Sequence, residues 1–438
     1  MNTKNDTPLA RNVTRLAHLD LPGGGQVCVE GNYAYVGHVG GKNGHDTTIL
    51  DVADPKHPKV VCTLKQDHPD SHSHKVRVAG DLMIVNVEQN STGMGRRAED
   101  LHHVRARLQW SSGREPTDGE LEQALKLKKG ELPLLLKTHQ SGYANGGFKI
   151  YDISDRAAPR LLAYQKTGGV GVHRFDMDGN YAYISTEMEG YLGNILVIYD
   201  IRDPRHPAEV SRWWLPGQHI AGGETPTWHE RSYRLHHALR RGDRMWAGVW
   251  QAGMRVIDVS DITRPRTIGG YNYHPPFKDP THTFMPLPAP IDGRHIAVTI
   301  DEEERYYNAE VSEERRGRMH ACISVFDVTD VGNIKPLSLF QVSELDSPWS
   351  RTPRGRFGAH QFHEHADGAL IYATWFSGGL RIIDLADPSA PREVGHFIPE
   401  PVGGNALPQS NDVYVDRRGL IYLLDRNAGF DILENGRT

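Results

Sequence analysis

The amino-acid sequence predicts an all-β fold, a seven-bladed β-propeller that forms one domain over residues 1–438. Two recurring patterns predict this architecture. The first is a β-hairpin that begins with histidine and turns six residues later at Gly-Asp or Gly-Asn, with apolar residues alternating around the turn. The second is an apolar strand that ends in Asp and leads into a turn of the Asp-Pro-x-x-Pro kind. Such units recur roughly every 40–50 residues, a spacing typical of propeller blades.

The histidine hairpin occurs three times without a gap, starting at His74, His173 and His236. Two longer copies keep the same His-x-apolar start at His282 and His360. In a propeller the first strand of each blade lines the central channel, so equivalent positions in successive blades form a ring around the axis. We therefore expect these histidines to meet there.

The start of the fourth hairpin is ambiguous, because two histidines are adjacent in the sequence. His237 fits the His-x-apolar start better, whereas His236 keeps the spacing to Gly242. We favour His236 because spacing determines the face that a strand side chain takes. The first and seventh units have Gln26 and Asn411 in place of the histidine.

The strand that ends in Asp follows each hairpin, and a further strand follows its turn, which gives about four strands per unit. Copies lie at 48–58, 148–159, 197–207, 254–265, 323–336 and 380–391, with a fragment at 430–433. The predicted units are 25–64, 72–165, 171–215, 234–275, 281–342, 358–398 and 409–434. The seventh unit has only three strands, and residues 12–21 are predicted to supply the fourth. This N-terminal strand would close the ring and remove exposed strand edges.

The strand and turn at residues 48–58 read Thr-Ile-Leu-Asp-Val-Ala-Asp-Pro-Lys-His-Pro. This pattern resembles the repeat of the LVIVD-repeat family of β-propellers, and the resemblance covers nearly the whole chain apart from the insertions. It implies the propeller fold. It implies little about function, because propellers host many activities.

Three insertions interrupt the units, at residues 91–141, 216–233 and 302–319. The first places a helical insertion in blade 2, because residues 120–129 are typical of a helix that ends at Gly130. The first two insertions are candidates for a lid or for the contacts of a homo-oligomer. The acidic run at 301–304 is expected to be solvated, with Asp301 as the exception.

Composition argues against several classes of protein. The net charge of −5 offers no basic patch for nucleic acid, and no run of 18 apolar residues predicts a membrane span. The N-terminus lacks the apolar core of a signal peptide. Cys28, Cys62 and Cys322 lie far apart and match no metal or redox spacing. We therefore expect a cytoplasmic protein that binds a small-molecule substrate, and neither nucleic acid nor a membrane.

Several imidazoles packed around one axis would be costly to charge and would compete for hydrogen bonds. A bound metal ion removes that conflict, so we predict a metal site. Its candidate ligands are His74, His173, His236 or His237, His282 and His360. An all-imidazole site suits a divalent transition metal, Fe(II) first, with Mn(II), Zn(II), Ni(II) or Cu(II) as alternatives. The other interpretation is a polar, water-filled channel.

The hairpin register predicts the neighbours of the histidines, because the second strand returns to their level eight residues after the turn glycine. An acid stands at this position in three hairpins. The pairs are Glu88 with His74, Glu187 with His173, and Asp301 with His282. A carboxylate that accepts the outer N–H of a ligating histidine fixes its orientation, so these acids are the candidate catalytic carboxylates. Trp250 and Phe376 share the register and are expected to pack there or to wall a substrate pocket.

The inferred site resembles, in geometry only, the iron centre of the carotenoid-cleaving dioxygenases, which are also seven-bladed propellers. The resemblance implies oxygen chemistry at Fe(II) on a small polar, carboxylated or aromatic molecule. A redox-neutral hydrolase, lyase or isomerase that uses the metal as a Lewis acid is the second interpretation, and a non-catalytic binding scaffold is the third. Five arginines that could bind a substrate carboxylate flank the histidine strands: Arg231, Arg234, Arg351, Arg354 and Arg356.

Overall fold

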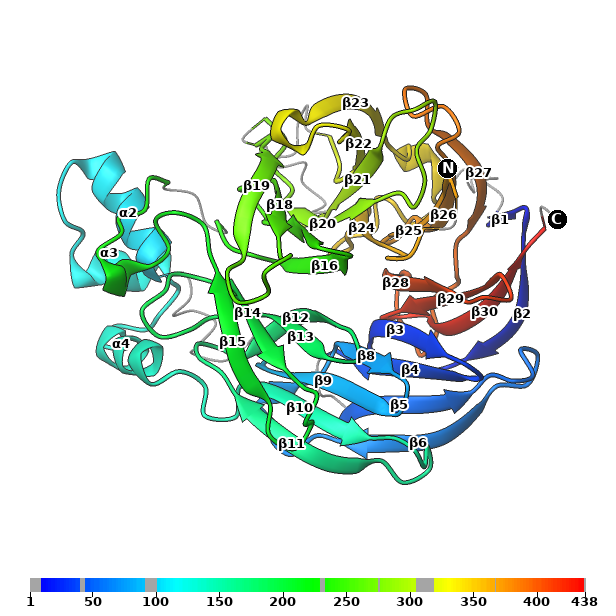
Figure 1. Cartoon of the computed structure of the whole chain (residues 1–438), viewed down its shortest axis with the longest axis horizontal. Coiled ribbons are helices and arrows are strands. Elements are labelled where there is room, and N and C mark those ends of the chain that lie inside the picture. The colour runs from blue at the N-terminus through cyan, green and yellow to red at the C-terminus, as the bar shows by residue number, and fades with distance from the viewer. Residues whose placement is uncertain are drawn as a thin grey trace.

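The computed structural model describes residues 9–39, 44–90, 101–228, 233–274, 276–304, 319–366 and 368–436. In these residues the strands form seven antiparallel sheets around a common axis, so the predicted seven-bladed propeller is confirmed (Figure 1). Arg231 and parts of the three insertions lie outside the described residues.

The first four blades follow one another along the chain. Blade 1 contains β3 (Gly24–Glu30), β4 (Tyr33–His38), β5 (His45–Asp51) and β6 (Lys59–Lys65). Blade 2 contains β7 (Ser71–His72), β8 (Val76–Ala79), β9 (Leu82–Gln89), β10 (Gly147–Asp152) and β11 (Arg160–Lys166). Blade 3 contains β12 (Val172–Met177), β13 (Tyr181–Thr186), β14 (Ile195–Asp200) and β15 (Ala208–Trp213). Blade 4 contains β16 (His237–Arg241), β17 (Arg244–Gly248), β18 (Met254–Asp258) and β19 (Arg266–Tyr271).

The last three blades complete the ring. Blade 5 contains β20 (Thr281–Pro286), β21 (Ile296–Asp301), β22 (Ile323–Asp327) and β23 (Lys335–Phe340). Blade 6 contains β24 (Ala359–Phe362), β25 (Leu370–Trp375), β26 (Gly379–Asp384) and β27 (Arg392–Phe397). Blade 7 contains β28 (Ser410–Val415), β29 (Leu420–Asp425) and β30 (Gly429–Asn435). Short 3-10 turns lie at η1 (Ile220–Gly222), η2 (Val331–Asn333) and η3 (Glu344–Asp346).

The N-terminal segment closes the ring, as predicted. Strand β2 (Val13–Leu19) pairs with β30, from Val13 opposite Asn435 to Leu19 opposite Phe430. It therefore forms the outer strand of blade 7, and the two ends of the chain lie close together (Figure 1). A two-residue strand that the sequence did not predict, β1 (Ala10–Arg11), extends blade 6 beside β27.

The Asp at the end of each third strand makes the turn that the repeat pattern predicts. The carboxylate of Asp51 accepts a hydrogen bond from the backbone N–H of Ala53 at 2.9 Å. The same contact, two residues along, recurs at Asp152, Asp200, Asp258, Asp327 and Asp384. This local bond gives the chain an alternative to the sheet ladder, so the strand ends there.

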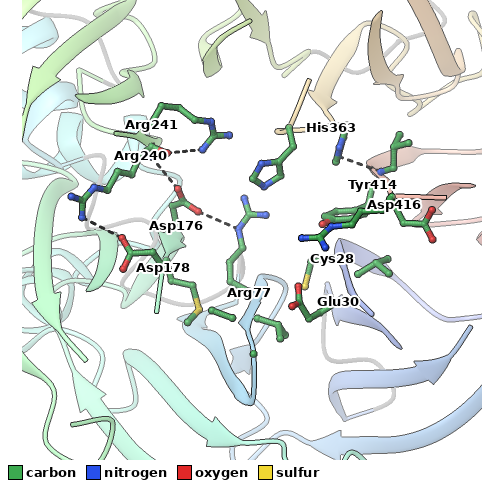
Figure 2. A pocket seen from close by; sticks show the side chains of 18 of the residues that line it. Cys28, Glu30, Arg77, Asp176, Asp178, Arg240, Arg241, His363, Tyr414 and Asp416 are labelled. Carbon is green, nitrogen blue, oxygen red and sulfur yellow. Dashed lines mark hydrogen bonds and ion pairs between the residues drawn. The ribbon is translucent and has the colours of Figure 1, made fainter. Parts of the chain in front are cut away.

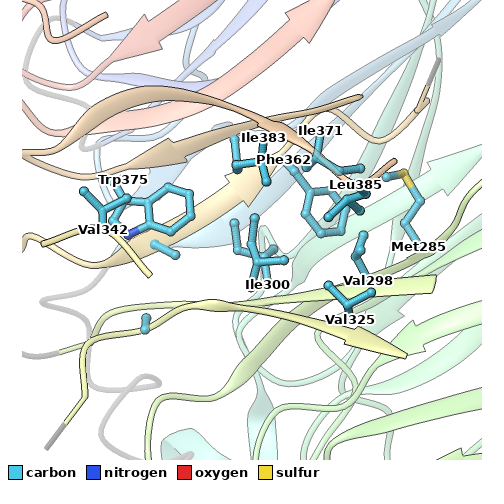
Figure 3. Packing of buried hydrophobic residues seen from close by; sticks show 14 of the residues in the cluster. Met285, Val298, Ile300, Val325, Val342, Phe362, Ile371, Trp375, Ile383 and Leu385 are labelled. Carbon is cyan, nitrogen blue, oxygen red and sulfur yellow. The ribbon is translucent and has the colours of Figure 1, made fainter. Parts of the chain in front are cut away.

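The apolar core lies between neighbouring blades. Between blades 5 and 6, Val298 and Ile300 of β21 pack against Ile371 and Trp375 of β25 (Figure 3). Each such side chain contributes about 1.5–3 kcal/mol on full burial. The blades therefore hold one another in a rigid ring, which fixes the positions of the residues that face the axis.

The insertion in blade 2 forms three helices that stand away from the ring: α2 (Leu101–Ser112), α3 (Asp118–Ala124) and α4 (Leu132–Ser141) (Figure 1). The predicted helix over 120–129 is only partly right. Helix α3 begins earlier, where Thr117 and Glu120 form a capping box. It ends at Ala124, because Lys126 takes a left-handed backbone conformation with φ of 55°.

Candidate metal centre

The structure brings five predicted histidines together at one end of the propeller axis. The ring centroids of His74 and His173 are 5.5 Å apart, and those of His173 and His236 are 5.0 Å apart. The arc continues to His282 at 3.8 Å and to His360 at 4.6 Å. These five side chains come from five successive blades and are called the histidine arc below.

Irregular inner strands aim these side chains. The pairing of β12 with β13 shifts between Val172 and Arg174, which leaves His173 as an extra residue in its strand. The same shift occurs at His282 and at His360. A β-bulge bends its strand and redirects a side chain. Three members of the arc therefore owe their direction to a local break in the ladder.

His236 belongs to the arc and His237 does not, which agrees with the spacing argument. Nε2 of His237 lies 3.1 Å from Oε1 of Glu364, and the ring faces that carboxylate. The ring of His236 lies between those of His173 and His282. The assignment of a ligand role to either residue stays a prediction.

Three arc histidines are held in one tautomer. Nδ1 of His236 donates to the carbonyl oxygen of His282 at 2.6 Å. Nδ1 of His282 donates to Oε1 of Gln361 at 2.9 Å, and Nδ1 of His360 donates to the carbonyl oxygen of Asn411. The Gln361 amide is oriented because its nitrogen donates to Glu364. With Nδ1 protonated, Nε2 of each neutral ring carries the lone pair that binds a metal.

His74 is held in the opposite tautomer. Backbone groups orient the amide of Asn86, whose oxygen accepts from the N–H of Lys75 at 2.8 Å and whose nitrogen donates to the carbonyl of Val172 at 2.8 Å. That amide nitrogen also lies 3.2 Å from Nδ1 of His74. Nδ1 must therefore accept, and the proton of the neutral ring sits on Nε2.

Glu88 lies beside the arc, as predicted, and links two blades. It is fully buried, and its Oε1 accepts from Nδ1 of His173 at 2.9 Å. Its Oε2 lies 3.0 Å from Nε2 of His72 and 3.8 Å from Nδ1 of His74. The sheet pairs Glu88 with His72 rather than His74, because residues 73–75 interrupt the inner strand.

The predicted partner of His282 is corrected by one residue. Asp301 is buried, but it pairs with Thr281 and accepts from the hydroxyl of Tyr273 at 2.5 Å. The carboxylate that faces His282 belongs to Glu302, whose Oε2 lies 3.8 Å from Nε2. The bulge at His282 causes the difference, because an extra residue shifts the register that the sequence argument counted.

Two further expectations also change. Glu187 is half-buried with its side chain against Gly169, and the carboxylate bonded to Nδ1 of His173 is that of Glu88. The acidic run is not mainly solvated, because Glu303 is fully buried and accepts from the backbone N–H of Ala321 at 2.9 Å.

Burial keeps the arc neutral. It is the largest cause that lowers the pKa of His74, His236, His282 and His360 well below the usual value, and neighbouring positive charges lower it further. Neutral imidazole is the form that binds a metal. The arc is therefore ready to bind a cation without first losing protons.

Trp250 covers one side of the arc under backbone strain. Its ring centroid lies 5.8 Å from that of His236, and its φ of 44° is an outlier for a bulky residue. Nε2 of His236 and the indole nitrogen of Trp250 are both buried without a hydrogen-bond partner in the described part of the chain. Strain and unsatisfied polar atoms gather at functional sites.

The predicted arginines fall into two groups. Arg356 stacks 3.8 Å above the ring of Phe376, which lies 4.7 Å from that of His360, and Arg234 stacks 4.8 Å from Trp250. These two lie at the arc. Arg351 is exposed and pairs with Glu344 at 3.0 Å, and Arg354 is exposed, so neither belongs to the arc.

Four segments of the chain match the family model described as the LVIVD repeat, at residues 24–65, 175–213, 242–273 and 367–398. The chain contains LVIVD repeats. The matches fall on blades 1, 3, 4 and 6, and they include the strand and turn that end each third strand. The predicted resemblance to LVIVD propellers is thus supported. No curated protein matches the chain significantly in sequence.

Solved structures share the fold of this LVIVD propeller at low identity. The C-terminal WD40 domain of Sif2 is 8% identical with a TM-score of 0.52, covering 96% of this chain and 98% of that one. A chain of the mitotic checkpoint complex is 10% identical at 0.52, covering 99% and 97%. The periplasmic gluconolactonase PpgL of Pseudomonas aeruginosa is 12% identical at 0.53, covering 91% and 93%. At these identities the likeness shows the propeller fold alone.

Two groups of the LVIVD propeller offer three metal-ligating atoms each, all within 4.8 Å of one another: His72, His74 and Glu88, and His282, Glu302 and His360. Sequence reasoning missed His72 and Glu302. His72 stands two residues before His74, on the same face of an extended strand, and this spacing could have revealed it. Glu302 could not be found by counting, because the bulge is invisible in the sequence.

The other end of the axis of the LVIVD propeller holds a separate cavity of about 1080 Å³. It is lined by the hairpin turns, including Gly80 and Gly242, and Figure 2 shows Arg77 extending toward Asp176 within it. No arc histidine lines this cavity. No helix in the described residues is long and apolar enough to cross a membrane.

Proposed function

We propose that this propeller is a metal-dependent enzyme whose divalent transition metal binds among His236, His282, His360 and Glu302. One observation carries the proposal. Nε2 of His282 and Nε2 of His360 both present lone pairs, and the carboxylate of Glu302 lies 3.8 Å from the first and 3.7 Å from the second. Three acceptors that face one another in a buried place repel unless a cation lies between them.

The remaining donors fit the same ion. Nε2 of His236 is the buried lone pair without a partner, and its ring centroid lies 3.8 Å from that of His282. Imidazole and carboxylate together suit Fe(II), Mn(II), Zn(II), Ni(II) or Cu(II). Fe(II) with oxygen chemistry is the first candidate, because histidine and carboxylate with open positions is the donor set of non-haem iron oxygenases.

A redox-neutral reaction is the second candidate, and the place of Glu302 favours it. A carboxylate on the metal beside histidines is also the donor set of zinc hydrolases, in which the ion activates water or polarises a carbonyl. The similar fold of a gluconolactonase shows that a propeller enzyme of this size exists. The substrate we expect is small and carries an anionic or polar oxygen group, since Arg356 lies beside His360.

Elemental analysis of protein purified without chelators should find close to one transition-metal ion per chain. Glu302→Gln should lower the affinity for that ion by about 10-fold or more, because the variant removes the charge that faces both Nε2 atoms. Competition with a chelator measures this affinity. Glu393→Gln is the control, because Glu393 also pairs with a histidine, His396 at 2.9 Å, but in the outer strand of blade 6.

The same samples separate the candidate functions. Iron that makes the protein consume oxygen in a panel of small acids supports the first candidate, whereas zinc or manganese with hydrolysis of esters or lactones supports the second. A chain that binds no metal, even after incubation with each ion, would leave the propeller as a binding scaffold and would refute the proposal.

A further inference from the structure

A second polar ring lies directly beneath the histidine arc. It consists of the residues that follow the arc position in each blade: Lys75, Arg174, His237, Thr283, Gln361 and Asp412. All of them are buried. Their contacts run across the axis, since Arg174 of blade 3 pairs with Glu364 of blade 6 at 2.5 Å.

This second ring holds more positive than negative charge. Its floor is the pair of Arg77 with Glu364, and the same carboxylate also takes one nitrogen of Arg174. The cations are then Lys75, Arg77 and Arg174, whereas the carboxylates within this layer are Glu364 and Asp412. The positive charges of Lys75 and Arg174 both lower the tendency of Asp412 to protonate, which places all three groups within electrostatic reach of one another.

Two of these cations lack partners. Nε and Nη1 of Arg174 are buried and have no hydrogen-bond partner in the described residues. Nζ of Lys75 has no hydrogen bond and no carboxylate within ion-pair distance in the same part of the chain, although only 4% of the residue is exposed. Burial is the main cause that lowers the pKa of Lys75, followed by the charge of Arg174, so the two cations are close.

Leaving buried cations without a counter-charge is strongly unfavourable. We propose that the space on the axis between the histidine arc and the Arg77–Glu364 pair binds a small monovalent anion, between the amine of Lys75 and the free nitrogens of Arg174. The chemistry is that of a carboxylate or a halide-sized inorganic anion. This site goes beyond the proposed metal function and exists in the metal-free protein.

The position of the site gives it a use. The positive charges of Lys75 and Arg174 both act on His236 and His282, which places them directly below the proposed metal. A substrate carboxylate held there would bring the rest of the molecule to the open side of the ion. The Arg77–Glu364 pair separates this space from the cavity of Figure 2, which Arg77 also lines.

The test is the thermal unfolding of the metal-free full chain in three sodium salts at equal ionic strength: formate, chloride and a bulky sulfonate that is too large to enter. Binding to the native state raises the Tm, so the wild type should unfold at a higher temperature in formate or chloride than in the sulfonate. A stronger effect of formate identifies a carboxylate site, and a stronger effect of chloride identifies an inorganic anion site.

Two variants locate the effect. Lys75→Met and Arg174→Lys should each weaken the affinity for the anion by about 10–100-fold, the usual cost of losing a charged hydrogen bond, so the difference between salts should nearly vanish. Arg381→Lys is the matched control, because Arg381 is equally buried but bonded to Glu393 and to the carbonyls of Gly378 and Asp346. It should lower the Tm in all salts and keep the difference.

The proposal is overturned if the wild type unfolds at the same temperature in all three salts, or if Arg174→Lys keeps the full difference. Should Lys75→Met fail to fold, Arg174→Lys decides alone, since it retains the charge and loses only the unpartnered nitrogens. Failure here leaves the metal result untouched, because every sample is metal-free.

Discussion

Deletion of residues 1–22 should prevent the propeller from folding into a soluble, stable protein. The deletion removes β2, the outer strand of blade 7, and leaves β30 with an unpaired edge from Phe430 to Asn435. It also removes Val13, Leu16 and Leu19 from the cores beside blade 7. Each large apolar side chain contributes about 1.5–3 kcal/mol, so the total loss approaches the about 5–15 kcal/mol that stabilises a typical domain.

Soluble yield and the Tm of any soluble fraction measure this effect. Deletion of residues 1–8 is the control, because it keeps β1 and β2 and should behave like the full chain. A soluble truncated protein lacking residues 1–22 with the Tm of the full chain would show that ring closure does not depend on this strand.

The blades could be predicted from the sequence because their cause is local and repeated. The alternation of apolar residues and the Asp-capped turn act within one hairpin, and seven copies confirm one another. The predicted unit 171–215 matches β12 to β15, which span Val172 to Trp213. The helix over 120–129 had no such repetition, and the left-handed conformation of Lys126 ended it early.

The histidine arc could be predicted for the same reason, since equivalent positions in successive blades must lie around one axis. The acids could not all be placed, because a single bulge changes the count. It moved the partner of His282 from Asp301 to Glu302, while Glu88 stayed near His74.

The tautomers lay beyond sequence reasoning altogether. The partner that fixes Nδ1 of His282 is Gln361 of the next blade, and that of His360 is the backbone of Asn411. Neither contact is within its own hairpin, so no local pattern contains it. Only the packed ring shows that His74 presents an N–H where its neighbours present lone pairs.

Substitution of two arc histidines should therefore have unequal effects on metal binding. His360→Ala removes a lone pair that faces Glu302 at 3.7 Å and should leave the site largely empty. His74→Ala removes a ring whose Nε2 carries a proton, so it should keep the metal and weaken the affinity by about 10–100-fold at most, as losses outside the ligand set do. Metal content after dialysis and chelator competition measure both variants.

The comparison also decides which of the two ligand groups is the metal site. His396→Ala is the control, because His396 is paired with Glu393 in an outer strand and should not affect metal binding. If His74→Ala empties the site while His360→Ala keeps it, the ion belongs to His72, His74 and Glu88, and the proton assignment for His74 is wrong. If His360→Ala alone empties it, the ion lies between two lone pairs and a carboxylate, where the charges of the buried residues require a cation.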